Sequence, residues 1–214
     1  PADGEQKLAG LVETLGVVVE EPSGPGRYRF SHSLMREVTY EALPIPVRAG
    51  LHQAVGEAIE RLYGADADSH IAELSRHFAE ALGTIGAAGG PDDHRALTYA
   101  RRAGDRAMQA HAYEEAAAEY QRALHALEVG GIGADSTAVP GLGDDLRCDL
   151  LLQLGAAQVR AGRYPDAKAT HLQAAEIARR LGRPDKLARA ALGFGQPHVE
   201  GGQVNRQLIE LLRE

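Results

Sequence analysis

Tryptophan is absent from the 214 residues, cysteine occurs once, and aromatic residues make up only 5% of the chain. The core must therefore be built from Ala, Leu and Val, which suits closely packed helices better than a β-sandwich. The single cysteine, Cys148, excludes an internal disulfide and fits a reducing, cytoplasmic compartment. No run approaches the roughly 20 apolar residues that a membrane-spanning helix needs, and there is no signal-like N-terminus. Because the chain starts at Pro1 without methionine and ends inside an expected helix, we expect it to be a piece of a longer protein.

Basic residues are also in short supply. The chain holds 23 Lys and Arg against 30 Asp and Glu, which gives a net charge of −7. Residues 1–50 alone carry five basic and seven acidic side chains. A surface that neutralises nucleic-acid phosphates through Lys and Arg should not be net negative. We therefore expect no direct nucleic-acid partner and no membrane partner.

Motifs for catalysis and for metal binding are missing as well. No phosphate loop of the Gly-x-x-x-x-Gly-Lys-Ser/Thr type occurs, and no nucleophile, base and orienting group stand together. His70 and His77 lie seven residues apart on one expected helix, with Glu73 between them. Zinc needs three or four converging ligands, so packed or solvated histidines are the expectation, with no metal. The chain itself should catalyse nothing.

The N-terminal residues predict a helix, a hairpin and a second helix. Apolar residues from Leu8 to Leu15 recur at helical spacing, and two short β-type runs at 17–19 and 28–30 flank a turn-rich tip at 22–26. Ser31 is a suitable N-cap for a helix whose stripe is Leu34, Val38 and Ala42. This order matches the second half of a winged helix. DNA binding, the usual alternative for such a module, is disfavoured by the acidic balance described above.

From Tyr28 to Leu43 the chain reads Tyr-x-Phe-x-His-x-Leu-x-Arg-Glu-x-x-Tyr-x-x-Leu. This pattern resembles the end of the winged-helix domain in signalling ATPases of the STAND class. These include bacterial LuxR-type transcription activators and cyclase-linked regulators and, more distantly, the apoptosome and plant-resistance NTPases. The resemblance covers roughly residues 5–125, and it extends to the remainder of the chain only through the repeat pattern.

In the distant relatives the matching tripeptide is Met-His-Asp, and its histidine contacts the β-phosphate of bound ADP. His32 matches that histidine and Leu34 the following leucine position, whereas Ser33 stands where those relatives have the acid. The resemblance implies that His32 senses ADP in a parent protein that binds ATP and ADP in an upstream domain. Arg36, one helical turn past His32, would face the same nucleotide, and an ion pair with a neighbouring acid is the alternative. The chain itself is expected to hold no cofactor.

Pro44 and Pro46 then interrupt the chain before two further helices. The apolar face of the first is expected to consist of Leu51, Val55, Ala58, Ile59 and Leu62. The second is expected to use Ile71, Leu74, Phe78 and Ala81, with Asp68 or Ser69 as its cap. Gly83 to Gly90 reads as a flexible break.

A repeat of the tetratricopeptide type is the second strong pattern. Ala103-Gly104 is followed by Ala116, Tyr120 and Ala123, and Leu154-Gly155 by Ala167, His171 and Ala174, at identical offsets. Leu192-Gly193 would start a third unit, whose second helix would be Val204 to Glu214. We interpret His171, and likewise Tyr113, Tyr120 and Tyr164, as packing residues between helices. The pairs Arg101-Arg102 and Arg179-Arg180 predict a solvated face, with an acidic partner on a concave surface as the alternative.

The glycine-rich stretch at about 129–143 cannot continue a helix and predicts a long surface loop; no Lys-Ser/Thr follows that would make it a phosphate loop.

The expected fold is mainly α, a partial winged helix with one β-hairpin followed by a tetratricopeptide-like α-solenoid. We expect half of a winged helix at 1–45, a helical linker at 46–90 and the repeats at 91–214. The resemblance implies a regulatory or sensor arm of a multidomain bacterial ATPase, most naturally a transcriptional regulator. Its partners would be an inducer or a protein on the repeat surface and the upstream ATPase domain. A stand-alone scaffold for protein interactions is the alternative.

Overall fold

A computed structural model describes residues 17–21, 28–82, 91–130 and 142–195, and it is mainly helical with one small antiparallel hairpin. The predicted mainly α fold with a single hairpin is confirmed to that extent. The contacts separate two compact units, Pro1–Arg48 and Ala49–Glu214, and each is described by itself. None of the described helices combines the length and the apolar character that crossing a membrane requires.

The first unit contains a two-stranded hairpin and a helix. Its elements are β1 (Val18–Glu20), β2 (Tyr28–Phe30) and α2 (Ser33–Ala42). The strands pair antiparallel, as the predicted hairpin requires, and the structure places Val18 opposite Phe30. None of the α2 residues is buried, and Leu34 and Val38 of the predicted stripe are both exposed.

The start of α2 differs from the prediction. Ser31 was expected as the N-cap, but its hydroxyl donates to the carbonyl of Val17 at 3.1 Å and so ties the end of β2 to the start of β1. The N-cap position therefore passes to His32, which is extended (φ −136°, ψ 141°) and makes no side-chain capping bond.

The second unit begins within α3 (Ile45–Tyr63), continues through a 3₁₀ segment, η1 (Gly64–His70), and reaches α4 (Ile71–Ala81). The buried face of α4 agrees with its predicted pattern, although the N-cap is His70 rather than Asp68 or Ser69. The buried face of α3 was predicted correctly only at Ile59.

On α3, Leu51, Val55 and Leu62 of the predicted face are exposed, whereas Ile59 is buried as predicted. The helix also buries Ala49 and Gly56, which the prediction did not include. The reason is a close approach by Phe78 of α4. A Cβ on Gly56 would come within 2.9 Å of the Phe78 ring, so the glycine side of α3 receives the aromatic side chain. A stripe of leucines gives no hint of this arrangement, because the decisive position carries no side chain.

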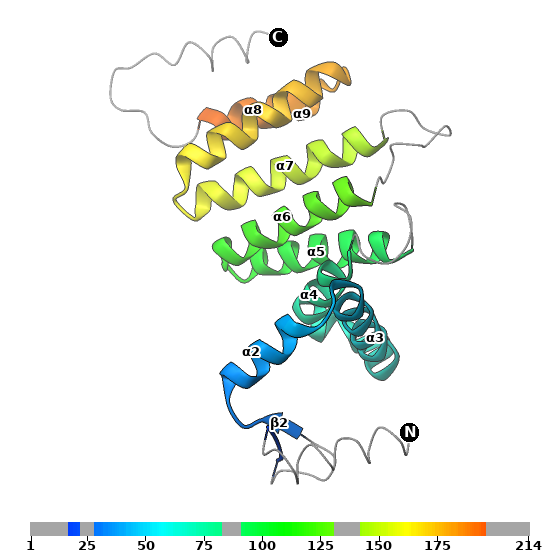
Figure 1. Cartoon of the computed structure of the whole chain (residues 1–214). Helices are drawn as coiled ribbons and strands as arrows, with labels where there is room; N and C mark the ends of the chain where they lie inside the picture. Colours follow the sequence, from blue (N-terminus) through cyan, green and yellow to red (C-terminus); the bar gives the residue numbers. More distant parts are fainter. Residues whose placement is uncertain (1–16, 22–27, 83–90, 131–141, 196–214) are drawn as a thin grey trace. The chain divides into compact units, whose positions relative to one another are not determined.

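The remaining helices lie side by side in chain order (Figure 1). They are α5 (Pro91–Gln109), α6 (Tyr113–Val129), α7 (Leu142–Arg160), α8 (Tyr164–Arg180) and α9 (Pro184–Gly195). Left-handed residues turn the chain at three of the connections: His111 (φ 61°), Gly162 (φ 76°) and Gly182 (φ 63°). Such short connections make the helices that they join antiparallel neighbours.

Alanines build most of the core between these helices. Ala96, Ala100, Ala116, Ala123 and Ala126 are all fully buried around α5 and α6. Small side chains let helices approach closely but provide little shape of their own. The register of neighbouring helices therefore depends on the few rings that fit between them.

Several predicted segments lie outside the described residues. These are the first helix around Leu8 to Leu15, the hairpin tip, the break at 83–90, the glycine-rich residues 131–141, and the helix expected at Val204 to Glu214. The described helices end at Val129 and resume at Leu142, on either side of the predicted glycine-rich loop.

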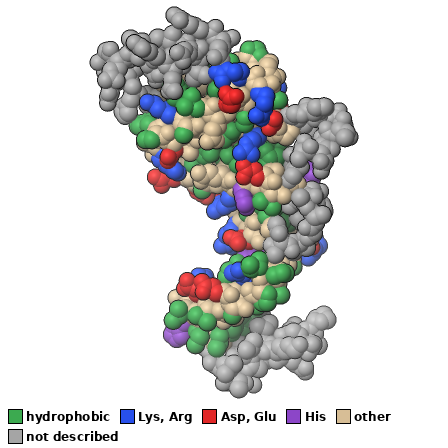
Figure 2. Space-filling model, turned by 45° about the horizontal axis from the view of Figure 1, so that its top comes forward, with side chains coloured by type: hydrophobic (Ala, Val, Ile, Leu, Met, Phe, Trp, Pro, Cys, Tyr) green, Lys and Arg blue, Asp and Glu red, His purple; other side chains and the backbone are tan. Residues whose placement is uncertain are grey.

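Charges of both signs are mixed on the face shown in Figure 2. Three of the four arginines in the basic pairs singled out in the sequence take part in ion pairs. Arg179 lies 2.8 Å from Glu176, Arg180 lies 2.8 Å from Asp144, and Arg102 pairs with Asp68. Exposed pairs of this kind contribute little to stability.

Candidate functional site

The residues singled out for nucleotide sensing lie on α2. His32 precedes the first turn and Arg36 lies one turn later, with the Arg36 N–H donating to the His32 carbonyl at 3.3 Å. Both side chains are exposed. This exposure leaves them accessible in the first unit, and their contact with ADP stays a prediction.

The two histidines that invited a metal interpretation have different neighbours. His77 is largely buried and its Nδ1 lies 2.9 Å from Nδ1 of His52, whereas His70 stacks on Tyr63 and lies 3.3 Å from Glu73. Burial, followed by the nearby His52, lowers the pKa of His77. Among the described residues no group of three metal-binding side chains comes together.

Buried charges elsewhere in the second unit are paired within the fold. The Lys186 ammonium of α9 lies 2.9 Å from Asp145 and 2.8 Å from Asp149, both on α7. Burial opposes its charge, but the hydrogen bonds to Asp149 and Asp145 outweigh burial and raise the pKa of Lys186. This cluster holds α9 against α7 and has a structural role.

The contact between α5 and α6 shows how a ring is accommodated in this fold. The Tyr120 ring lies against Gly104, where a Cβ would come within 2.6 Å of it. The Tyr120 hydroxyl donates to Oδ1 of Asp105 at 2.8 Å, and the amide of Gln153 donates to the same oxygen at 3.2 Å. Burial and the hydrogen bond to Asp105 raise the pKa of Tyr120. This buried polar group is therefore satisfied.

The equivalent contact between α7 and α8 is not satisfied in this way. The His171 ring takes the place of Tyr120 and lies against Gly155, where a Cβ would come within 2.6 Å of it. Ala156 follows Gly155, whereas Asp105 follows Gly104. His171 is only 3% exposed, and neither ring nitrogen has a hydrogen-bond partner in the described part of the chain. Burial lowers its pKa, so the imidazole is neutral near pH 7.

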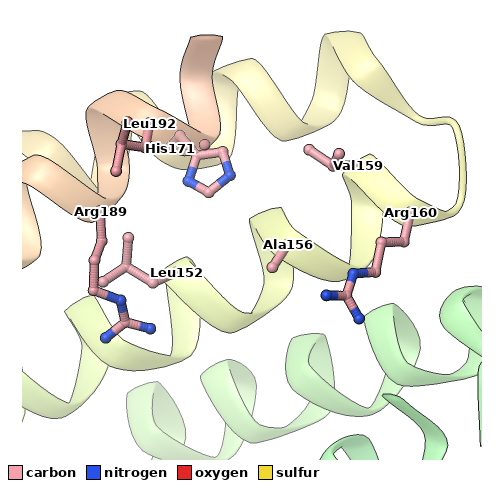
Figure 3. A pocket seen from close by; sticks show the side chains of 8 residues that line it. Leu152, Ala156, Val159, Arg160, His171, Arg189 and Leu192 are labelled. Carbon is pink, nitrogen blue, oxygen red and sulfur yellow. The ribbon is translucent and has the colours of Figure 1, made fainter. Parts of the chain in front are cut away.

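A pocket of about 280 Å³ adjoins this unsatisfied ring. Its lining comes from three helices and consists of Leu152, Ala156, Val159, Arg160, His171, Arg189, Leu192 and Gly193. Figure 3 shows the His171 ring and the Ala156 methyl facing one space, with Arg189 on one side and Arg160 on the other. The apolar side chains supply most of the wall.

The two arginines give this pocket a positive charge. Arg189 has no ion pair among the described side chains, and the Arg160 guanidinium makes a cation–π contact with the Tyr113 ring, 5.7 Å from its centroid. A neutral imidazole can donate one hydrogen bond and accept another. The pocket therefore offers a hydrogen-bonding group, two cationic groups and an apolar wall, which are the usual components of a small-ligand site.

The sequence interpretation of His171 as a packing residue is correct for its burial but missed the pocket. The sequence does contain a difference that points to the pocket: Asp105 follows Gly104, whereas Ala156 follows Gly155. This difference could be interpreted only from the structure, which shows that the side chain after the glycine contacts the ring on the next helix, as Asp105 contacts Tyr120.

Comparison of the chain with protein-family models, with curated proteins and with solved structures gives no match.

Proposed function

We propose that this chain is the ligand-receiving, regulatory arm of a multidomain signal-transduction ATPase of the STAND class. The observation that carries the proposal is the pocket on α7, α8 and α9, which adjoins a buried histidine without a partner in the described residues. A buried polar group that lacks a partner costs about 1–3 kcal/mol. A ligand that supplies the partner recovers this free energy on binding, so the site is suited to sensing.

The repeated contact of a ring with a glycine supports a tetratricopeptide-like solenoid as the architecture. Tyr120 with Gly104 and His171 with Gly155 occupy corresponding positions in successive antiparallel pairs. Gly193 of α9 meets the other side of the His171 ring and would begin the next unit. Solenoids of this kind present ligand-binding surfaces built from several repeats.

The hairpin followed by α2 supports the second part of the proposal, a winged-helix element that responds to nucleotide. His32 and Arg36 are both exposed on α2, as a contact with an upstream ATPase domain would require. Under this proposal ATP and ADP bind upstream, and ligand binding to the arm changes how firmly the closed, ADP-bound state is held.

A catalytic role for the pocket has little support. Its described polar side chains are one neutral imidazole and two guanidinium groups, with no hydroxyl, thiol or carboxylate for the imidazole to activate or to be oriented by. The nearby Cys148 is buried, its thiol donates to the Ala174 carbonyl at 3.4 Å, and burial raises its pKa, all of which reduce its reactivity.

A stand-alone scaffold for protein interactions is the second candidate, because the pocket lies entirely within the helical unit and does not depend on α2. The coding sequence before Pro1 separates the two candidates. We expect it to encode a Gly-x-x-x-x-Gly-Lys-Ser/Thr loop. A gene without such an ATPase segment would favour the scaffold.

The regulatory part is tested in the parent protein by measuring ADP release and ATP turnover. An Ala156→Leu variant should fill the pocket and abolish the response to the ligand while leaving nucleotide affinity unchanged. An Ala169→Leu change, on the exposed side of α8, is the matched control. A full response in the Ala156→Leu protein would remove the pocket from the regulatory mechanism.

A further inference from the structure

The chemistry of the missing partner can be read from the neighbouring helix pair. Between α5 and α6 the buried ring donates its hydrogen bond to a carboxylate, that of Asp105. Between α7 and α8 the corresponding position holds Ala156. Its methyl group is smaller than an aspartate side chain, and it forms part of the pocket wall. What the second pair lacks, compared with the first, is a carboxylate beside the ring.

The charges around the pocket favour the same group. Arg160 lies at the end of α7 and Arg189 on α9, and both line the pocket. Arginine binds carboxylates through paired N–H groups, and such charge-assisted hydrogen bonds are about twice as strong as neutral ones. No acidic side chain lines the pocket among the described residues. An anion is therefore attracted, and an ammonium group is repelled.

The rest of the wall sets the body of the ligand. Leu152, Val159 and Leu192 are apolar, and the volume of about 280 Å³ is at the small end of the range for ligand sites. A hydrocarbon body of modest size fills such a space, whereas a sugar or a nucleotide would leave many hydroxyl groups against apolar walls.

We propose that the pocket binds a small organic carboxylate with a hydrocarbon body, whose carboxylate accepts a hydrogen bond from His171 as the Asp105 carboxylate accepts one from Tyr120. This inference rests on the proposed function, since it names the ligand class of the same pocket. Arg160 and Arg189 balance the ligand charge, and the leucines hold its hydrocarbon part.

The first experiment compares three probes on the intact chain by calorimetry: 3-phenylpropionate, its neutral analogue 3-phenylpropan-1-ol, and acetate. Methyl NMR signals of Leu152 and Leu192 locate the binding site. We expect 3-phenylpropionate to bind roughly tenfold to a hundredfold more tightly than the alcohol, because the alcohol lacks the charge-assisted bonds. Acetate should bind more weakly than 3-phenylpropionate, since it lacks the hydrocarbon body.

The second experiment supplies the missing group from the protein. Ala156→Asp places a carboxylate beside His171, and it should weaken 3-phenylpropionate binding at least tenfold. Ala169→Asp adds the same charge at an exposed position of α8 and should leave the affinity unchanged. If Ala156→Asp does not fold, His171→Phe and Arg189→Gln carry the test, each with an expected loss of roughly tenfold.

Three results would overturn the inference. Equal affinity for acid and alcohol, with shifts at Leu152 and Leu192, would mean a different ligand class while the receiving function stands. Tighter binding of a peptide with a free C-terminal phenylalanine than of 3-phenylpropionate would replace the small acid by a protein terminus. If neither the probes nor a diverse library of small molecules shifts those methyl signals, the proposed receiving function fails as well.

Discussion

The ring of His171 touches Gly193 of α9 so closely that a Cβ at position 193 would lie 2.3 Å from two of its atoms. The same ring meets Gly155 of α7 on the other helix. One imidazole thus sets the spacing of three helices, because both neighbours lack a side chain at the point of contact.

The first prediction concerns this spacing. Gly193→Ala should destabilise the chain by about 1–3 kcal/mol, since the added methyl overlaps the ring, and denaturant unfolding measures the loss. Combining it with His171→Ala should recover part of that loss, which a double-mutant cycle quantifies. Gly50→Ala on α3 is the control: nothing lies within 4 Å of its Cβ, and helix propensity predicts a gain of about 0.5–1 kcal/mol. Additive losses for Gly193→Ala and His171→Ala would show that the two positions do not share a contact.

The second prediction concerns the satisfied pair. Asp105→Ala leaves the buried Tyr120 hydroxyl without its acceptor and should cost about 1–3 kcal/mol. Tyr120→Phe in the same background removes the stranded hydroxyl and should recover much of that loss. Thermal unfolding of the two single variants and the double variant decides the matter. A double variant no more stable than Asp105→Ala would place the cost elsewhere, for example in the bond from Gln153.

A third prediction follows from the lowered pKa of His171. Above its ordinary pKa of 6.5 the imidazole is neutral in both the folded and the unfolded chain, so His171 adds no pH dependence. As the pH falls through 6.5, the unfolded chain takes up a proton that burial denies to the folded one, and the free energy of unfolding decreases. The limiting slope is about 1.4 kcal/mol per pH unit.

His171→Phe should flatten this slope below pH 6.5, measured by denaturant titrations between pH 5 and 8. Some slope should remain, because the pKa of His77 is lowered too. The charged groups lining the pocket beside His171 are Arg160 of α7 and Arg189 of α9. The negative charge of a bound carboxylate favours the protonated ring, so ligand binding should strengthen as the pH falls. An unchanged slope in His171→Phe would contradict the assignment.

The fourth prediction concerns the switch implied by the resemblance. His32 is exposed, so His32→Ala should leave the melting temperature of this chain unchanged. In the full-length protein the loss of one hydrogen bond to a charged acceptor should shift the closed-to-open ratio roughly tenfold to a hundredfold. ADP release and basal activity measure the shift. Unchanged ADP retention would show that His32 has no part in nucleotide sensing.

Sequence periodicity was sufficient for the helices and for some buried faces. The hairpin and the buried stripe of α4 follow directly from alternation and from helical spacing. The buried face of α3 could not be predicted in the same way, because Gly56 adds nothing to a hydrophobic pattern and yet receives the Phe78 ring. Patterns of side chains are least informative where a contact depends on the absence of one.

The candidate site could be predicted from the sequence less completely than the fold. The positions of Tyr120 and His171 within the helix pairs were predicted, but their different surroundings depend on Asp105 and Ala156, which approach the rings only in the folded chain. The N-cap of α2 shows the same limit, since Ser31 has the right chemistry for a cap but finds a nearer acceptor on Val17.

The contrast between Asp105 and Ala156 also has a genetic side. One base change converts any alanine codon into a codon for aspartate or for glutamate, so one point mutation at position 156 is enough to supply a carboxylate there. Ala156 lies inside α7 and lines the pocket, so the substitution would change the pocket wall directly. Under the proposal that the pocket receives a carboxylate, a single base change at this position is therefore enough to gain or lose ligand binding.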